Sequence, residues 1–330
     1  SDEYAELLNI EQDLNNRNLE DIIDIDFYRL IDRKVIFDLV SAVDQRTLTE
    51  GDVTIYCRQR KQTHWYAESR HLYDAVEVAS QFIAALDRVQ LNAVTAADAV
   101  QSYVSNWYRV DQLYRQFIYA LKASGQTTLL NSLMEKVEGL YTNRYLLPLA
   151  TAWQSHVDKM DRWQVMDVVP QSDFYARHVK PTLDRGNKLC VIISDAFRYE
   201  AGNELVSRIR QEDRYQAKIS HMLSALPSYT QLGMASLLPL ANEPLSINQK
   251  DATVKVGNQS SQGAAGRDKI LKSALNGKSS AVQAKNLMDM TRDESRDLFK
   301  ANDVVYIYHN RIDHAGDKMQ SEGEAFEATE

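Results

Sequence analysis

The chain has 330 residues, of which 44% are hydrophobic and 25% charged, and it carries a formal net charge of −8 at pH 7. This composition is typical of a globular protein, and the length allows two domains. The acidic balance excludes a generally basic nucleic-acid coat protein, although a local basic groove is compatible with it.

Cysteine use and the chain ends bear on the cellular compartment. Cys57 and Cys190 lie far apart in the sequence and indicate neither a disulfide framework nor a zinc knuckle, which favours a reducing compartment. No stretch approaches the roughly 18 apolar residues that a membrane span needs, and the first residues do not form a signal peptide. We therefore expect a cytoplasmic protein. The chain starts with Ser1 and stops at Glu330 inside a helix-like acidic run, so we also expect a fragment of a longer protein.

Helical periodicity dominates residues 1–163. Apolar residues recur at spacings of three and four over residues 26–43, 73–91 and 96–123, as they do in helices that face a core. Aromatic residues at such spacings could stack nucleic-acid bases, but a core or a protein interface is the favoured interpretation. We predict an all-helical domain, with residues 164–187 as a linker or connecting helix.

The first strand is predicted at residues 189–193, LCVII, which form a short apolar run typical of a strand buried on both faces. A helix is predicted over residues 196–210, so Asp195 should lie where a parallel strand ends. Ligands bind at that edge of open α/β sheets, and a carboxylate there suits a hard cation. The alternative is that Ser194 or Asp195 only caps the helix.

The middle of the second half carries weaker signals. Residues 215–224 alternate in part and predict a second strand, followed by a turn at residues 227–230 and a short helix at residues 231–238. A hydroxyl at a helix start commonly serves as an N-cap. The same position directs backbone N–H groups at an anion, so a nucleophilic hydroxyl there could hold a phosphoryl group. Residues 248–267, rich in Gly, Ser and Gln, predict a mobile surface insertion.

The last informative stretch is residues 303–318. Residues 304–308, VVYIY, predict a second buried parallel strand. Four potential ligands follow it, namely His309, Asp313, His314 and Asp317. Asp313 and Asp317 are four residues apart and share one face if the segment is helical. Two carboxylates on one face repel unless a cation or a proton lies between them. Chance clustering of surface polar residues is the alternative.

Three blocks in this order, SDAFRYE, LPSYTQLGMASLLP and YIYHNRIDHAGDK, resemble successive conserved blocks of the PglZ domain, the alkaline phosphatase-like component of BREX phage-defence systems. The resemblance covers about residues 188–318. It implies an α/β fold, with an alkaline-phosphatase-like, mostly parallel sheet flanked by helices, preceded by the all-helical domain. It also implies that residues 188–330 form a PglZ-like domain that is incomplete at its C-terminus, because the second metal ligands of the superfamily do not follow Lys318.

The resemblance assigns a metal ion to Asp195, Asp313 and Asp317. Asp317 stands where many superfamily members have histidine, and a carboxylate shifts the preference from zinc towards manganese or magnesium. His309 and His314 could supply nitrogen instead. The implied cofactors are therefore divalent metal ions: zinc, manganese or magnesium.

The resemblance assigns the reacting hydroxyl to Thr230. This residue matches the position of the nucleophile or metal-bridging hydroxyl, and Ser228 is the fallback. His309 is the expected substrate contact. In this interpretation metal ions activate the hydroxyl and stabilise the phosphoryl oxygens.

The function implied by the resemblance is a metal-dependent phosphodiesterase or nuclease of a BREX system. The alternative is a non-catalytic scaffold that binds other BREX components, such as the DNA methyltransferase. Outside the family, a phosphomutase-like enzyme acting on a small phosphorylated metabolite is a third hypothesis. The expected partners are other BREX components, including a DNA methyltransferase, with nucleic acid as a further potential partner and no membrane.

Overall fold

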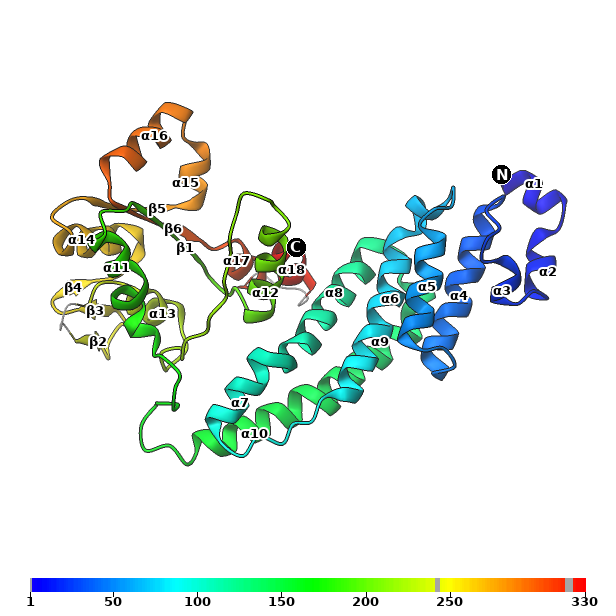
Figure 1. Ribbon diagram of the computed structural model, residues 1–330, viewed down its shortest axis with the longest axis horizontal. Helices are drawn as coiled ribbons and strands as arrows, with labels where there is room; N and C mark the ends of the chain where they lie inside the picture. Colours follow the sequence, from blue (N-terminus) through cyan, green and yellow to red (C-terminus); the bar gives the residue numbers. More distant parts are fainter. Residues whose placement is uncertain (1, 241–243, 318–322) are drawn as a thin grey trace. The chain divides into compact units, whose positions relative to one another are not determined.

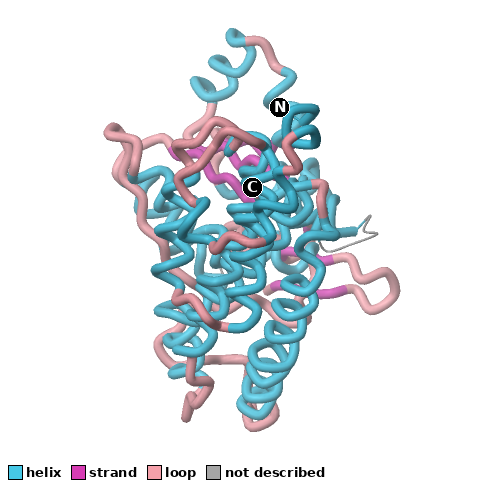
Figure 2. Tube along the Cα trace, turned by 90° about the vertical axis from the view of Figure 1, so that its right-hand side faces the viewer, coloured by secondary structure: helices cyan, strands magenta, loops and turns pink. Residues whose placement is uncertain are grey.

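The computed structural model describes residues 2–240, 244–317 and 323–330. The chain divides into two compact units, Ser1–Asp158 together with Gln320–Glu330, and Lys159–Met319. Helices account for most of the described chain, and the strands are short (Figure 2).

The first unit is all helical (Figure 1). Its elements are α1 (Asp2–Leu7), α2 (Ile10–Asn15), α3 (Leu19–Ile22), α4 (Arg29–Gln45), α5 (Glu50–Arg60), α6 (Tyr66–Arg88), α7 (Ala96–Ser102), η1 (Tyr103–Trp107), α8 (Tyr108–Ser124), α9 (Thr127–Leu140), η2 (Tyr141–Leu146), α10 (Leu147–Val157) and α18 (Gly323–Thr329). The predicted helical region is confirmed. The long helix predicted at residues 96–123 contains a turn of π-helix, η1, between α7 and α8.

The predicted apolar stripes form the core of this unit. Val35, Val76 and Phe117 have no exposed surface, and they belong to one cluster that spans α4, α6 and α8. Tyr73 is fully buried in the same cluster, and the rings of Tyr114 and Tyr141 stack with centroids 3.8 Å apart. These aromatic rings are therefore core residues, as the favoured interpretation had it.

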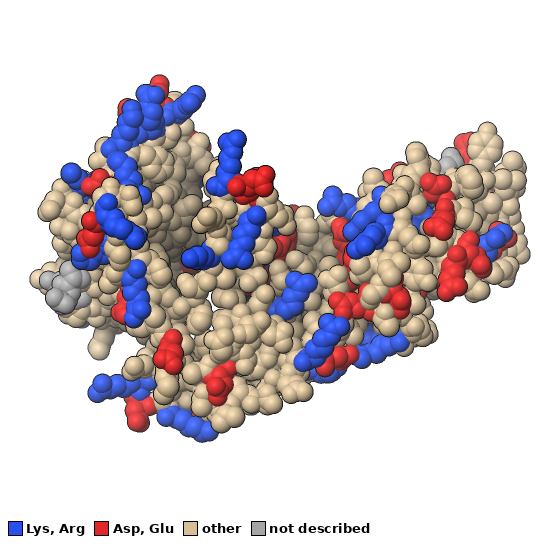
Figure 3. All heavy atoms as spheres, in the orientation of Figure 1, with Lys and Arg blue, Asp and Glu red and all other residues tan. Residues whose placement is uncertain are grey.

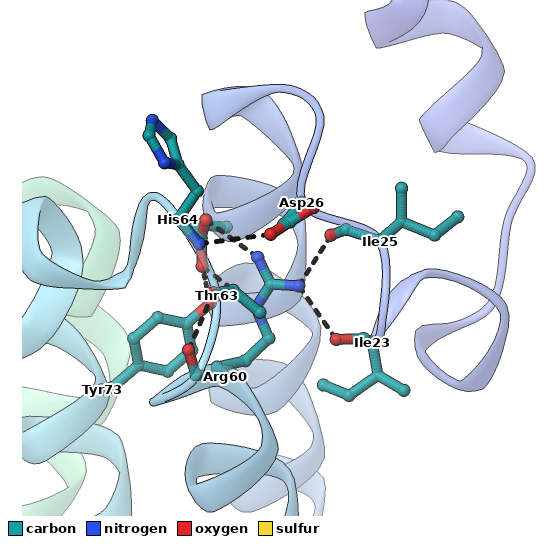
Figure 4. Close-up of polar contacts among 8 residues, drawn as sticks. Ile23, Ile25, Asp26, Arg60, Thr63, His64 and Tyr73 are labelled. Carbon is teal, nitrogen blue, oxygen red and sulfur yellow. Dashed lines mark hydrogen bonds and ion pairs between the residues drawn. The ribbon is translucent and has the colours of Figure 1, made fainter.

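A buried ion pair joins three of these helices. Nη2 of Arg60 on α5 lies 2.9 Å from Oδ2 of Asp32 on α4, and both side chains are fully buried. Nη1 of Arg60 donates hydrogen bonds to the carbonyls of Ile23 (2.9 Å) and Ile25 (2.7 Å), and Figure 4 shows both carbonyls directed at the guanidinium. The hydroxyl of Tyr73 on α6 also donates to Asp32. The network thus fixes α4, α5 and α6 to the turn that precedes α4.

The second unit is an α/β structure. Its elements are η3 (Gln171–Asp173), η4 (Tyr175–Val179), α11 (Lys180–Asp184), β1 (Leu189–Ser194), α12 (Tyr199–Arg210), α13 (Thr230–Ser236), β2 (Leu245–Ile247), β3 (Val254–Val256), β4 (Gln259–Ser260), α14 (Gly263–Ala274), β5 (Ser279–Gln283), α15 (Ala284–Asp289), α16 (Arg292–Ala301), β6 (Val304–His309) and α17 (Arg311–Asp317). The main sheet is parallel, in the order β1-β6-β5, and helices flank it. The predicted fold class is confirmed. Within the described residues, no helix has both the length and the apolar character needed to cross a membrane.

The core of the second unit lies on one face of the main sheet. Val191 and Ile193 of β1 pack there with Met234 of α13 and Leu271 of α14. The hydroxyl of Tyr306 on β6 donates to the carbonyl at the end of α13 (3.0 Å). Helices α13 and α14 therefore cover the same face of the sheet.

The prediction that the first strand is buried on both faces is wrong. Ile192 is 69% exposed and Cys190 is also exposed, whereas Val191 and Ile193 face the core. Because successive side chains of a strand point to opposite faces, the exposed pair lies on one face of β1. β1 is an edge strand of the described sheet, and α12, which follows it, does not cover that face.

Two further predictions in this unit fail. Residues 215–224 form no strand among the described residues, and an isolated bridge between Leu223 and Pro170 takes its place. Residues 248–267 are not an unstructured insertion, because they contain β3, β4 and the start of α14, with Val254 and Val256 buried. This small antiparallel sheet packs against α13.

Candidate metal centre

The ends of β1 and β6 bring two of the predicted site segments to one edge of the sheet. Ser194 pairs with His309 in the parallel register, and the Ser194 hydroxyl lies 2.9 Å from Nδ1 of His309. The backbone N–H of Asp195 donates to the carbonyl of His309 (2.9 Å). Asp195 and the helix after His309 therefore leave adjacent strands at their carboxyl ends, where open α/β sheets bind ligands.

A strained turn follows Asp195. Ala196 has φ +59°, in the left-handed region that costs a residue with a Cβ about 1–2 kcal/mol. Helix α12 begins only at Tyr199, and its N-cap, Arg198, makes no side-chain capping bond. Neither Ser194 nor Asp195 caps that helix, so capping does not explain the Asp195 carboxylate. Backbone strain of this kind concentrates at functional sites.

Asp313 lies on α17, half-buried, within electrostatic reach of two other carboxylates. Burial raises the pKa of Asp313, and the negative charges of Asp195 and Asp317 raise this pKa further, against a lowering effect of His314. A hard cation would relieve this repulsion, and carboxylate oxygens are the donors that magnesium and manganese prefer. The donor chemistry therefore fits a divalent ion. Within the described residues, however, no three His, Cys, Asp or Glu side chains gather closely enough to form a ligand set.

Thr230 is the first residue of α13 and is exposed. The N-cap of that helix is Tyr229, which makes no side-chain capping bond, so Thr230 does not serve as the cap. Across residues 2–240, 244–317 and 323–330, the Thr230 hydroxyl forms no intramolecular hydrogen bond, so none joins it to Asp195 or Asp313. Ser228, the fallback, is exposed as well. The structure thus leaves the hydroxyl accessible without joining it to the carboxylates.

Arg267 on α14 was not identified from the sequence. It is only 6% exposed, its Nε donates to the carbonyl of Ser261 (3.1 Å), and its guanidinium carbon lies 4.5 Å from the centre of the Tyr308 ring. The charge of Asp195 also acts on it. Arginine in a Gly- and Ser-rich stretch ordinarily indicates an exposed loop. The neighbouring Gly266 was the available signal, since glycine inside a helix often marks close packing.

Two surface hollows are not lined by the predicted site residues. One of about 870 Å³ in the first unit is lined by α2, α4 and the start of α9. Another of about 860 Å³ in the second unit lies between β4 and α14. Neither is lined by Asp195, Thr230 or Asp313. The candidate centre is therefore indicated by charge and by its place on the sheet.

Comparisons with known proteins bear on the same region. Residues 174–330 match the family described as the BREX system PglZ alkaline phosphatase-like domain. The alkaline phosphatase-like protein PglZ of Bacillus cereus (strain H3081.97) is 32% identical over an alignment that covers 99% of this chain and 39% of the relative. The alkaline phosphatase-like protein BrxZ of Escherichia coli O9:H4 (strain HS) is 35% identical over 86% of this chain and 33% of the relative. The chain thus spans well under half the length of these two relatives.

Proposed function

Through residues 174–330 the chain belongs to the family of BREX system PglZ alkaline phosphatase-like domains, and on this premise we propose that it is part of a metal-dependent phosphoester hydrolase of an anti-phage BREX system. One observation carries the proposal. Asp195 and Asp313 follow adjacent strands at the carboxyl edge of the sheet, close enough for one charge to raise the pKa of the other carboxyl. Paired carboxylates at that edge are suited to a cation.

Three carboxylates of this chain would hold the metal: Asp195, Asp313 and Asp317. His309 or His314 could add a nitrogen ligand. The candidate ions are zinc, manganese and magnesium, and a set dominated by carboxylates favours the latter two. Bound there, the ion would polarise a phosphoryl oxygen and stabilise the charge that develops on it.

The exposed Thr230 hydroxyl is the proposed nucleophile. Its Oγ1 would lose its proton to solvent and form a bond to phosphorus, while the bond from phosphorus to the leaving oxygen breaks and that oxygen takes a proton from solvent. Water would then cleave the bond between Oγ1 and phosphorus, releasing a phosphomonoester and restoring the hydroxyl. His309 would contact the substrate: in the tautomer whose Nδ1 accepts from the Ser194 hydroxyl, Nε2 carries the proton of the neutral ring and can donate to a phosphoryl oxygen.

We propose a phosphodiester, as in a nucleic acid, as the substrate. Residues 159–319 contain 23 Lys and Arg against 19 Asp and Glu, although the whole chain is acidic. Lys and Arg side chains are visible over α15 and α16 on one face (Figure 3), although these two helices together carry four Lys and Arg and four Asp and Glu. Positive charge on this unit favours a polyanion over a small neutral ester.

The second candidate function is a scaffold that binds other BREX components, such as a DNA methyltransferase. The lack of a complete ligand set among the described residues favours it. In this proposal residues 1–163 form the partner-binding helical domain, residues 164–187 the connection and residues 188–330 the PglZ-like domain. The cytoplasm is the proposed compartment for either function.

Hydrolysis of a chromogenic phosphodiester by the full-length protein and by this chain tests the proposal, with zinc, manganese or magnesium added after chelator treatment. We expect metal-dependent turnover that falls by at least about a hundredfold in Asp195→Asn and Thr230→Ala, while Ser228→Ala keeps most of it. A full-length protein that is inert with every metal but still protects cells against phage would favour the scaffold. Loss in Ser228→Ala and not in Thr230→Ala would move the nucleophile to the fallback residue.

A further inference from the structure

Arg267 is a buried cation that forms no ion pair with a carboxylate of the described residues. With 6% of its surface exposed, its guanidinium is almost fully removed from water, and burial lowers its pKa. Within the part of the chain that the structure describes, no carboxylate lies within ion-pair distance of it. Buried charges are ordinarily paired, because desolvating an isolated charge costs several kcal/mol.

The surroundings hold this guanidinium in place. Ser261, itself fully buried, donates hydrogen bonds from its N–H (2.9 Å) and its hydroxyl (2.8 Å) to the carbonyl of Val254, and its own carbonyl accepts from Nε of Arg267. The Tyr308 ring lies against the guanidinium at 4.5 Å. A ring and one neutral carbonyl orient a cation without neutralising it, so the guanidinium is held in place without an ion pair.

The position of this charge is informative. Tyr308 is the last residue but one of β6 and pairs with Ile193, which precedes Ser194 and Asp195. The charge of Asp195 also acts on Arg267. A fixed guanidinium therefore lies close to the carboxyl edge of the sheet, on the face that α13 and α14 cover. Guanidinium groups match the geometry of phosphoryl oxygens and bind them through paired hydrogen bonds.

We propose that Arg267 binds the phosphoryl oxygens of an anionic substrate at the carboxyl edge of the main sheet, beside Asp195. This inference rests on the proposed function and deepens it, because it names the group that recognises the phosphate. Arg267 supplies the positive charge that holds the anion against the acidic side chains of the site, and the anion in turn supplies the counter-charge that Arg267 lacks in the free protein.

Inorganic phosphate is the probe, titrated by calorimetry into the metal-free protein in chelator, so that neither a bound metal nor turnover contributes. We expect saturable binding to the wild type, weakened about tenfold or more in Arg267→Met. Arg267→Lys keeps the charge and the stem but loses the planar fork, so its dissociation constant should lie between the two. Lys269→Gln, at an exposed position of the same helix, is the matched control for general electrostatics and should change the constant less than about twofold.

Unfolding midpoints keep the result interpretable. Arg267→Met removes a buried charge with no partner, so its midpoint should not fall below that of the wild type; if that variant fails to fold, the Arg267→Lys titration decides. No saturable binding by the wild type, or equal affinity in the Arg267 variants, overturns the inference. Arg267-dependent binding in a protein that hydrolyses no phosphodiester would retain it and reject the proposed function. Turnover of the phosphodiester with an unchanged KM in Arg267→Lys would support the proposed function and reject the role of Arg267.

Discussion

Arg60 and Asp32 form an ion pair in which neither side chain has any exposed surface. Removing both charges from water is costly, and the helical unit offsets that cost with the carbonyls of Ile23 and Ile25 and the hydroxyl of Tyr73. The pair therefore acts as a fixed joint between α4, α5 and α6. The ion pair therefore stabilises the first unit only when both Arg60 and Asp32 are present.

Arg60→Met should destabilise the first unit by about 3–5 kcal/mol, because the Asp32 carboxylate would be left buried and unpaired. The double variant Arg60→Met with Asp32→Leu should recover most of that loss. Urea unfolding followed by circular dichroism measures both. Arg46→Met is the control, because Arg46 pairs with Asp87 at the surface and should cost no more than about 1 kcal/mol. Equal losses at Arg60 and Arg46 would contradict the buried joint.

The turn after Asp195 predicts an unusual response to substitution. Ala196 has a left-handed backbone, which glycine adopts without strain and β-branched residues adopt poorly. Ala196→Val should destabilise the second unit by about 1–2 kcal/mol, whereas Ala196→Gly should leave its stability unchanged or raise it by up to about 1 kcal/mol. Chemical unfolding tests both. Ala265→Val, at an exposed position of α14, is the control and should cost under about 1 kcal/mol. The reverse order at Ala196 would show that the turn is not left-handed.

The two cysteines should differ sharply in reactivity. Cys57 is fully buried, and this burial raises the pKa of its thiol to about 12, while Cys190 is exposed on the free face of β1. Because the thiolate is the reactive form, a disulfide reagent at about pH 8 should modify one thiol in the native chain and two after denaturation. Cys190→Ser should abolish the native reaction. Rapid modification of two thiols in the native chain would contradict a closed helical core. Modification of no thiol would mean that the exposed face of β1 is covered in solution.

Gly266 predicts a steric effect on the Arg267 environment. A Cβ at this position would lie 2.6 Å from the carbonyl oxygen of Ser260, so Gly266→Ala should displace the end of β4 next to Ser261 and cost about 1–3 kcal/mol. Phosphate affinity should fall with it. Gly233→Ala in α13 is the matched control, because no atom lies within 4 Å of its added Cβ, and it should gain up to about 1 kcal/mol of helix propensity. The thermal unfolding midpoint should therefore fall in Gly266→Ala and rise in Gly233→Ala.

Sequence patterns predicted the parts of the fold that depend on apolar periodicity. The runs LCVII and VVYIY became β1 and β6, and the helical stripes became the first unit, because burying such runs dominates the folding free energy. β5 was missed since its sequence, SSAVQ, holds one strong strand former, Val282, and its pairing with β6 overrides local propensity. The pattern of β1 also could not show that Ile192 is exposed, because periodicity identifies an apolar side chain and not its neighbours.

The residues around the candidate site also divide into those that the sequence could predict and those that it could not. Asp195 and Asp313 could be predicted, since each follows a recognisable strand and the parallel register then brings the strand ends together. Arg267 and the pair of Arg60 with Asp32 could not, because a charged residue in a sequence ordinarily indicates exposure. Their burial depends on partners distant in the chain, which no local pattern records.

Metal binding at the strand ends can be separated from folding through Asp313. Burial and the charges of Asp195 and Asp317 raise the pKa of Asp313. The folded chain therefore binds this proton more tightly than the unfolded chain, and ionisation costs stability as the pH rises from the ordinary carboxyl pKa through the raised one. Above the raised pKa that cost is fully present, so Asp313→Asn in chelator should there have an unfolding midpoint at or above the wild-type value. Added Mn²⁺ should reverse the order, stabilising the wild type by about 2.7 kcal/mol at a hundredfold excess over its dissociation constant and the variant far less.

The Mn²⁺ effect should strengthen as the pH rises through the Asp313 pKa, because metal and proton compete for one carboxylate. Asp303→Asn, near Lys278 at the opposite end of β6, is the control and should respond to Mn²⁺ as the wild type does. A midpoint that Mn²⁺ shifts equally in all three proteins would remove Asp313 from the metal centre.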